Sequence, residues 1–164
     1  MRKIYREIGK YDILDSVHEI KLEPEEIDLL FERKCLKDKS TTTLEIDIFS
    51  ENKRDHEYIL GECTFISQRK IAKKIKCFFA KVDIITKHLI NYCERMYQVK
   101  PKFHIIIISM SGFPSKEIVK QIEGDSLDLS RNRILNIEYI NYDQFKKLAK
   151  ENRVKVDKYK KVLE

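Results

Sequence analysis

Apolar and polar residues alternate along this chain with two different periods, and the period changes from segment to segment. Across residues 68–97, apolar positions recur at steps of three and four, the spacing of one face of a long amphipathic helix. Residues 44–49 and 58–65 instead follow the period of two that is typical of strands. The connection between them is short, polar and charged, so we expect these strands to form an antiparallel hairpin.

The segments after residue 97 alternate between strand and helix patterns. A continuous apolar run over 103–109 predicts a central strand that is covered on both faces. Ser115 begins a short predicted helix that ends before Gly124. A predicted strand at 134–140 and a predicted helix at 142–150 complete the series.

Two helices are predicted before the hairpin. Apolar positions between residues 3 and 20 follow a helical spacing, and Pro24 suits the first turn of a second helix. We expect Ile27, Leu30 and Phe31 to form the buried side of that second helix.

This order of elements predicts an α/β fold, a three-layer α-β-α sandwich with a central mixed sheet. Strands joined through a helix normally run parallel, so the later strands would be parallel and the hairpin antiparallel. The length of 164 residues fits one domain. Within it we expect N-terminal helices in 1–40, an α/β core in 41–152 and a basic C-terminal tail in 153–164.

The composition predicts a protein of the cytoplasm with no membrane partner. No apolar run approaches the roughly 18 residues of a membrane span, and the first residues lack the apolar core of a signal peptide. The four cysteines are scattered, without the spacing of a zinc site. We expect all four to stay reduced in a cytosol and to pack as small hydrophobic residues.

Charged residues make up 37% of the chain, and the net charge of +6 is unevenly distributed. The high charge and the low glycine content lean toward a thermophile, although an AT-rich genome would give a similar bias. Between residues 69 and 102, ten Lys and Arg residues face two acidic ones, and between 145 and 164 the balance is eight to three.

Two basic segments of this kind favour a polyanionic partner, nucleic acid before membrane. The same pattern would arise if the lysine-rich helix faces were simply solvated. The residues that we expect to bind nucleic acid lie at the start of the long helix, and they are Arg69, Lys70, Lys73, Lys74 and Lys76.

The hairpin carries the candidate chemistry. Asp47 lies near the end of its first predicted strand and Glu62 in the middle of the second, so the two carboxylates can converge on one point. Two carboxylates that meet repel each other unless a cation lies between them. The alternative is that both are ordinary edge-strand charges that face water. No GxxxxGK[ST] motif occurs, so the chain does not hydrolyse ATP by that route.

The stretches Ile46-Asp47-Ile48, Leu60-Gly61-Glu62-Cys63-Thr64 and Ser109-Met110-Ser111-Gly112-Phe113 occur in the order seen in a known family. Over about residues 25–150 the chain resembles the PD-(D/E)xK, or restriction-endonuclease-like, nuclease superfamily. It is most similar to the nuclease-like domain at the C-terminus of many archaeal ATPases.

The resemblance implies a restriction-endonuclease-like fold and metal-dependent hydrolysis of DNA. Asp47, Glu62 and the backbone carbonyl of Cys63 would hold Mg²⁺ or Mn²⁺, and the metal would activate a water and stabilise charge on the scissile phosphate. The partners it implies are DNA and an ATPase on another chain, and a second copy of this chain is a further candidate.

The chain departs from the family at Thr64, where the motif has a lysine on the same strand face as the glutamate. Three outcomes follow. A lysine of the next helix, Lys70, Lys73 or Lys74, reaches back to the site; or the metal works alone and more slowly; or the domain is inactive and serves DNA binding or protein contact.

Such sites often include an acid from the first helix. Glu32 is the candidate for that role, with Glu25 and Glu26 as alternatives.

Overall fold

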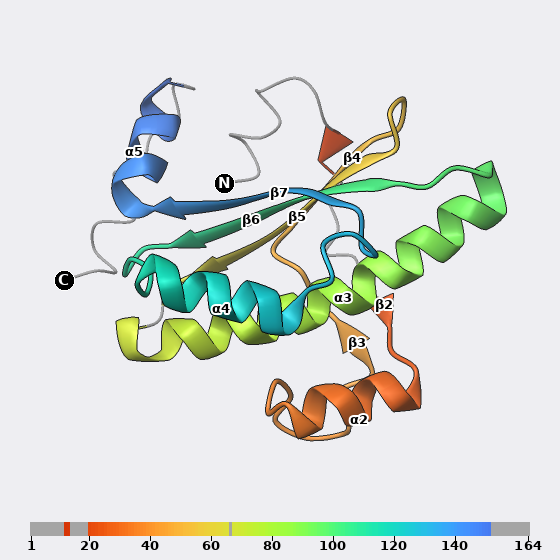
Figure 1. Cartoon of the computed structure of the whole chain (residues 1–164), viewed down its shortest axis with the longest axis horizontal. Helices are drawn as coiled ribbons and strands as arrows, with labels where there is room; N and C mark the ends of the chain where they lie inside the picture. Colours follow the sequence, from red (N-terminus) through yellow and green to blue (C-terminus); the bar gives the residue numbers. More distant parts are fainter. Residues whose placement is uncertain (1–11, 14–19, 66, 152–164) are drawn as a thin grey trace.

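The computed structural model describes residues 12–13, 20–65 and 67–151 and shows a mixed α/β arrangement (Figure 1). Its main sheet has the strand order β1-β4-β5-β6-β7. The strands are β1 (Asp12–Ile13), β4 (Ile48–Asn52), β5 (Glu57–Thr64), β6 (Lys102–Ser109) and β7 (Ile134–Asn141). A second, two-stranded sheet pairs β2 (Ile20–Lys21) with β3 (Thr43–Leu44).

Strand direction changes at the middle of the main sheet. β4 and β5 form an antiparallel hairpin in which Ile48 lies opposite Gly61. β5, β6 and β7 run parallel to one another, and Glu62 lies beside Ile107 of β6. The predicted hairpin, the parallel second half and the central position of the apolar strand β6 are therefore confirmed.

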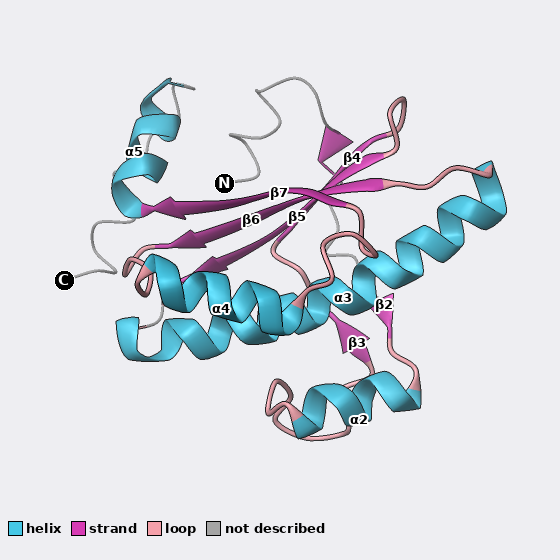
Figure 2. Cartoon of the chain, viewed as in Figure 1, coloured by secondary structure: helices cyan, strands magenta, loops and turns pink. Residues whose placement is uncertain are grey.

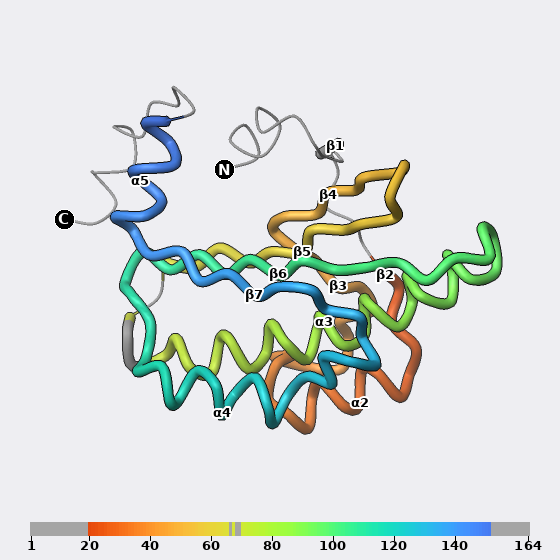
Figure 3. The backbone as a smooth tube through the Cα atoms, turned by 45° about the horizontal axis from the view of Figure 1, so that its top comes forward, coloured from red at the N-terminus to blue at the C-terminus, as the bar shows by residue number. Residues whose placement is uncertain are grey.

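Helices lie on both faces of the sheet (Figures 1 and 3). The long helix α3 (Gln68–Tyr97) and α4 (Lys116–Ser126) cover one face, and α5 (Tyr142–Glu151) packs on the other. α2 (Pro24–Glu32) packs against α3 on the side away from the sheet, beside β2 and β3 (Figure 2). The predicted bounds of α3 are confirmed, because its apolar stripe is unbroken for the whole length.

Two hydrophobic cores follow from this layering. The larger lies under α3, where Leu60, Phe103 and Ile105 of the sheet meet the helix residues Ile71, Ile75, Phe78, Val82 and Ile85. The smaller joins Ile59 and Ile106 to Phe145 of α5. Gly61 lies on the face of β5 that borders the smaller core, and a Cβ there would be 2.9 Å from Cδ1 of Ile48 and 3.1 Å from the carbonyl of Ile106. Only glycine allows the hairpin to pack this closely.

Several predictions for the first part of the chain are wrong. Asp12–Ile13 and Ile20–Lys21 are short strands, whereas a helix was predicted over 3–20; the rest of that helix lies outside the described residues. The first hairpin strand begins at Ile48, not at Leu44, because Thr43–Leu44 pair with β2 instead. Phe31 is 39% exposed and not on the buried side of α2.

Later in the chain, α4 continues through Gly124 to Ser126. The predicted basic tail at 153–164 lies outside the described residues. None of the helices in the described part of the chain combines the length and the apolar character that crossing a bilayer demands.

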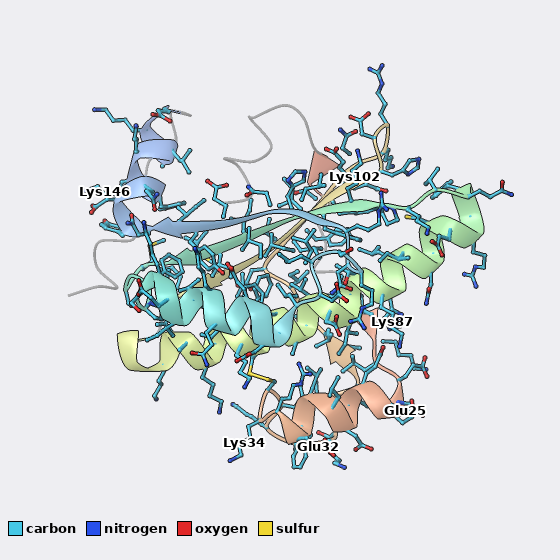
Figure 4. All side chains as sticks on the ribbon, in the orientation of Figure 1. Glu25, Glu32, Lys34, Lys87, Lys102 and Lys146 are labelled. Carbon is cyan, nitrogen blue, oxygen red and sulfur yellow. A yellow bond between two sulfur atoms is a disulfide. The ribbon has the colours of Figure 1, made fainter. Side chains whose placement is uncertain are left out.

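The prediction that all four cysteines are reduced is wrong. Cys35 and Cys77 form a disulfide across a sequence separation of 42, while Cys63 and Cys93 are free. The bond joins the segment after α2 to the middle of α3, where it is visible as the yellow bond in Figure 4. It fixes the α2 region to the helix that covers the sheet.

We expect this disulfide to contribute strongly to stability. Closing a loop of this length removes unfolded-state entropy worth about 4 kcal/mol at room temperature. The double variant Cys35→Ser/Cys77→Ser should lower the free energy of unfolding by about that amount in urea denaturation. A reductant should lower the stability of the native chain and leave the variant unchanged. Equal denaturation midpoints with and without reductant would contradict the expectation.

Candidate functional site

Glu62 is the acidic residue at the centre of the candidate site. It lies on β5 with its side chain on the α3 face of the sheet, and only 5% of that side chain is exposed. β5 leads within three residues into α3, whose second turn therefore passes back over the strand. Lys74 on that turn forms an ion pair with Oε1 of Glu62. A buried carboxylate needs such a partner, because burying an unpaired charge costs several kcal/mol.

Asp47 lies across the hairpin from Glu62. It directly precedes β4, and the register that pairs Ile48 with Gly61 brings Asp47 opposite Glu62 one step further on. The Cys63 backbone N–H donates a hydrogen bond of 2.8 Å to Oδ2 of Asp47. Asp47 is exposed, whereas Glu62 is buried, so the two carboxylates lie in different environments.

A pocket of about 430 Å³ opens over Glu62. One wall is the face of α3 that carries Lys70, Lys73, Lys74, Cys77, Phe78 and Lys81. The opposite wall is formed by Lys34 and Cys35, which the disulfide holds against α3. Five lysines and one glutamate give the pocket a formal excess of four positive charges. Such a concave, cationic site suits phosphate groups.

Two of these lysines have contacts that define the shape of the pocket. Lys74 pairs with Glu62 in the floor, and the Lys81 ammonium donates a 3.3 Å hydrogen bond to the backbone carbonyl of Glu45. The Lys81 contact ties α3 to the segment that precedes Asp47. The pocket itself is lined by three parts of the chain: the hairpin, α3 and the segment after α2.

Cys63 lies between the two carboxylate positions along the chain, but its thiol packs on the other face of the sheet. Burial raises the pKa of the Cys63 thiol to about 12, and the negative charges of Asp47 and Glu62 add to the shift. A thiol with so high a pKa is a poor nucleophile. Cys63 can serve the site only through its backbone.

The structure brings together several of the residues that the sequence analysis named. Lys74 pairs with Glu62, and Lys70 and Lys73 line the pocket. Asp47 lies opposite Glu62 in the register of the hairpin but is not a lining residue of the pocket. Thr64 is buried on the same strand face as Glu62. Lys34 and Lys81 also line the pocket, but the sequence analysis did not name them as site residues. Lys81 follows Lys74 by seven residues on the same helix face and could have been found from that spacing, whereas nothing local marks Lys34.

Other predicted site residues lie elsewhere. Glu32 is exposed on the outer side of α2 and does not line the pocket (Figure 4). Lys76 is exposed and is not a lining residue, and the side chain of Arg69 lies outside the described part of the chain. The buried acid of α2 is Glu26, whose carboxylate oxygens lie 3.0 and 3.1 Å from Nε2 of His88. Glu26 therefore joins α2 to α3 and is not part of the pocket.

The donor set at the hairpin suits a hard divalent cation. Asp47, Glu62 and the Cys63 carbonyl offer oxygen ligands only, and Mg²⁺ is usually bound by one or two carboxylates together with waters and phosphate oxygens. Within residues 20–65 and 67–151 no group of three His, Cys, Asp or Glu side chains comes together, so a closed site built from side chains alone is not found there. The residues present fit Mg²⁺ or Mn²⁺ whose remaining ligands are waters and phosphate oxygens.

We expect Lys74 to matter for stability as well as for chemistry. The variant Lys74→Ala leaves the Glu62 carboxylate buried without its ion pair. The loss should be about 2 kcal/mol in free energy of unfolding, less than the about 3–5 kcal/mol of a fully buried pair because Lys74 is 37% exposed. Lys73→Ala, one residue along and exposed, is the matched control and should change stability by less than about 0.5 kcal/mol. Equal losses would show that the ion pair contributes nothing.

Cys63 gives a second prediction, on reactivity with pH. At about pH 8 a cysteine of ordinary pKa is about one quarter thiolate, whereas Cys63 stays protonated until the pH nears 12. Alkylation of native protein at about pH 8 should therefore label Cys63 slowly. Asp47→Asn keeps an acceptor for the Cys63 N–H and removes one negative charge, so it should speed the reaction. An unchanged rate would show that Asp47 does not influence the thiol.

No protein-family model, curated protein or solved structure gives a significant match to this chain. The relationship to the restriction-endonuclease-like superfamily therefore stays a prediction from the sequence. The function has to be inferred from the hairpin carboxylates, the Lys74 ion pair and the lysine-lined pocket.

Proposed function

We propose that this chain is a metal-dependent hydrolase of DNA phosphodiester bonds, with a restriction-endonuclease-like α-β-α core. The observation that carries the proposal is the ion pair between the buried Glu62 carboxylate and Lys74 in the floor of a lysine-lined pocket. Lys74 supplies from α3 the ammonium group that Thr64 cannot supply from β5. Asp47, opposite Glu62 on the hairpin, is the second acid of the pair.

The order of elements supports the fold part of this proposal. An antiparallel hairpin leads into a long helix on one face of the sheet, and a parallel central strand follows. The carboxylates lie at the end of the hairpin that feeds this helix, so the helix supplies lysines to the same edge of the sheet. Asp47 and Glu62 on the hairpin and the lysines of α3 therefore lie at the same end of β5.

In this proposal, different residues would bind the metal, orient the water and bind the DNA phosphates. Asp47, Glu62 and the Cys63 carbonyl would hold Mg²⁺ or Mn²⁺, which when bound activates a water and offsets the charge of the phosphate. Lys74 is held beside Glu62, so its ammonium can orient a water or contact a phosphate oxygen there. Lys34, Lys70 and Lys73 would bind flanking phosphates and keep the DNA strand over Glu62.

A second candidate function rests on the same ion pair. The Lys74 ammonium already neutralises Glu62, and the described residues offer no third acidic ligand there. A domain of this kind could bind DNA through its lysines and leave the phosphodiester bond intact. The DNA-binding part of the proposal is common to both functions, and the hydrolase is distinguished by its need for Asp47. A homodimer and a separate ATPase partner stay predictions.

The test of the hydrolase is cleavage of single-stranded, double-stranded and branched DNA with Mg²⁺ or Mn²⁺. Glu62→Gln and Asp47→Asn should abolish cleavage, because each removes a metal-binding charge. Lys74→Gln should lower the rate by about 10²–10³-fold, the usual loss when one group that stabilises developing charge is removed. Lys120→Gln, an exposed lysine on α4, is the control and should leave the rate unchanged.

If no DNA is cleaved with either metal, the hydrolase proposal fails. Salt-dependent binding then decides whether the second function stands. A binding domain should lose affinity with a slope of about −0.7 to −0.9 per phosphate contact in a plot of log affinity against log salt, and it should keep that affinity in Asp47→Asn. Binding that does not respond to salt would exclude both functions.

A further inference from the structure

The position of Glu62 limits what kind of DNA can reach it. The carboxylate is 5% exposed in the floor of the pocket, so a scissile phosphate has to enter the pocket to contact it. A volume of about 430 Å³ lies at the small end of the roughly 300–1,000 Å³ range of small-ligand sites. One nucleotide fits such a space, whereas a duplex, which carries both strands and their stacked bases, does not.

The walls of the pocket are held together covalently. Cys35 and Cys77 both line the pocket, and their disulfide joins the segment after α2 to α3. The contact between the buried Glu26 carboxylate and the partly exposed His88 ring joins α2 to α3 a second time. Two attachments on one side oppose the widening of the pocket that a duplex would require.

Two exposed aromatic residues lie close in sequence to residues that line the pocket. Phe31 is 39% exposed, and its carbonyl accepts a 2.9 Å hydrogen bond from the N–H of Lys34, so it stands one turn from a pocket-lining lysine. The Lys39 ammonium lies 5.4 Å from the centre of the Phe31 ring. Phe65 is 49% exposed and follows Glu62 by three residues, where β5 ends.

Aromatic rings beside positive charges are the recurring means of binding single-stranded nucleic acid. Unpaired bases stack on the rings while the phosphates contact the basic side chains. In a duplex the bases are already stacked and paired, so exposed rings of this kind offer it little. The rings and the narrow pocket therefore favour the same substrate.

We propose that the pocket takes single-stranded DNA, with one phosphate over Glu62 and neighbouring bases on Phe31 and Phe65. This inference rests on the proposed function in using the same pocket, but it concerns binding and does not require cleavage. Lys34, held in place by the disulfide next to it, contacts a phosphate of the bound strand and is a positioning residue.

The test is binding in the absence of divalent metal, followed by fluorescence anisotropy. The probes are a labelled single strand of about 20 nucleotides, longer than one site, and the blunt duplex of the same sequence. The single strand should bind at least about tenfold more tightly, a difference that loss of stacking on one ring can produce. Phe31→Ala and Phe65→Ala should each weaken single-strand binding by about 5- to 150-fold and leave duplex binding unchanged.

Controls separate stacking from general damage. Leu135→Ala removes an exposed apolar side chain from β7 and should leave both affinities unchanged. Phe65→Tyr keeps an aromatic ring at this position and should therefore keep the single-strand affinity that Phe65→Ala loses. If Phe65 had only a structural role, its loss would weaken binding of the single strand and of the duplex alike. Lys34→Gln should reduce the salt slope for the single strand by about 0.7.

The outcomes distinguish this inference from the proposed function. Equal or tighter binding of the duplex, or equal losses for both probes in the phenylalanine variants, overturns the single-strand inference and leaves cleavage of duplex DNA as a valid result. Ring-dependent binding of the single strand without any metal-dependent cleavage supports the inference and overturns the hydrolase.

Discussion

The ion pair between the buried Glu62 carboxylate and Lys74 is the interaction on which the site depends. A carboxylate on the covered face of a sheet is tolerated only with a cation beside it, because the cost of burying it alone is several kcal/mol. The cation comes from α3 for a steric reason. Thr64 is 3% exposed and lies beside Ser109 of β6, so a lysine at that position would have to bury its whole stem. A lysine on the second turn of α3 reaches Glu62 from above and keeps part of its side chain in water.

The pocket exists because α2 is attached to α3 at two separate places. The Cys35–Cys77 disulfide is one and the Glu26–His88 contact is the other. Without them Lys34 would belong to a surface segment, and Glu62 would lie in an open groove on one side of α3. Disulfides are rare in the cytosol of mesophiles and common inside hyperthermophiles. The Cys35–Cys77 bond is therefore unexpected in the cytosol of a mesophile, and the cytoplasmic location stays a prediction.

The spacing of apolar residues was enough to predict the helices and strands of the second half of the chain. It did not predict which strands pair with each other in the first half. The apolar stripe of α3 and the apolar run of β6 are long and unbroken, so their bounds were predicted to within about one residue. The sequence predicts that Thr43 and Leu44 form a strand, but it does not show which strand they pair with. In the structure they pair with β2. Asp47, Glu62 and Lys74 could be predicted because they lie close in sequence. Lys34 could not, because it is brought to the pocket by a disulfide across 42 positions.

Asp47 is the residue that the fold does not explain. Glu62 has a structural partner in Lys74 of α3, and the hydrophobic core beneath that helix holds it over the sheet. Asp47 accepts one backbone N–H, which an asparagine would do equally well, and like charges opposite each other on paired strands destabilise a hairpin. Burial is the main reason that the pKa of the Cys63 thiol is raised, and the negative charges of Asp47 and Glu62 add to the shift. Asp47 is exposed, so water can solvate its carboxylate, and a cation shared with Glu62 would stabilise it further. Lys74 contacts Glu62, and a bound divalent metal would satisfy both acids at once. The proposed hydrolase gives Asp47 a role that a domain that only binds DNA would not require.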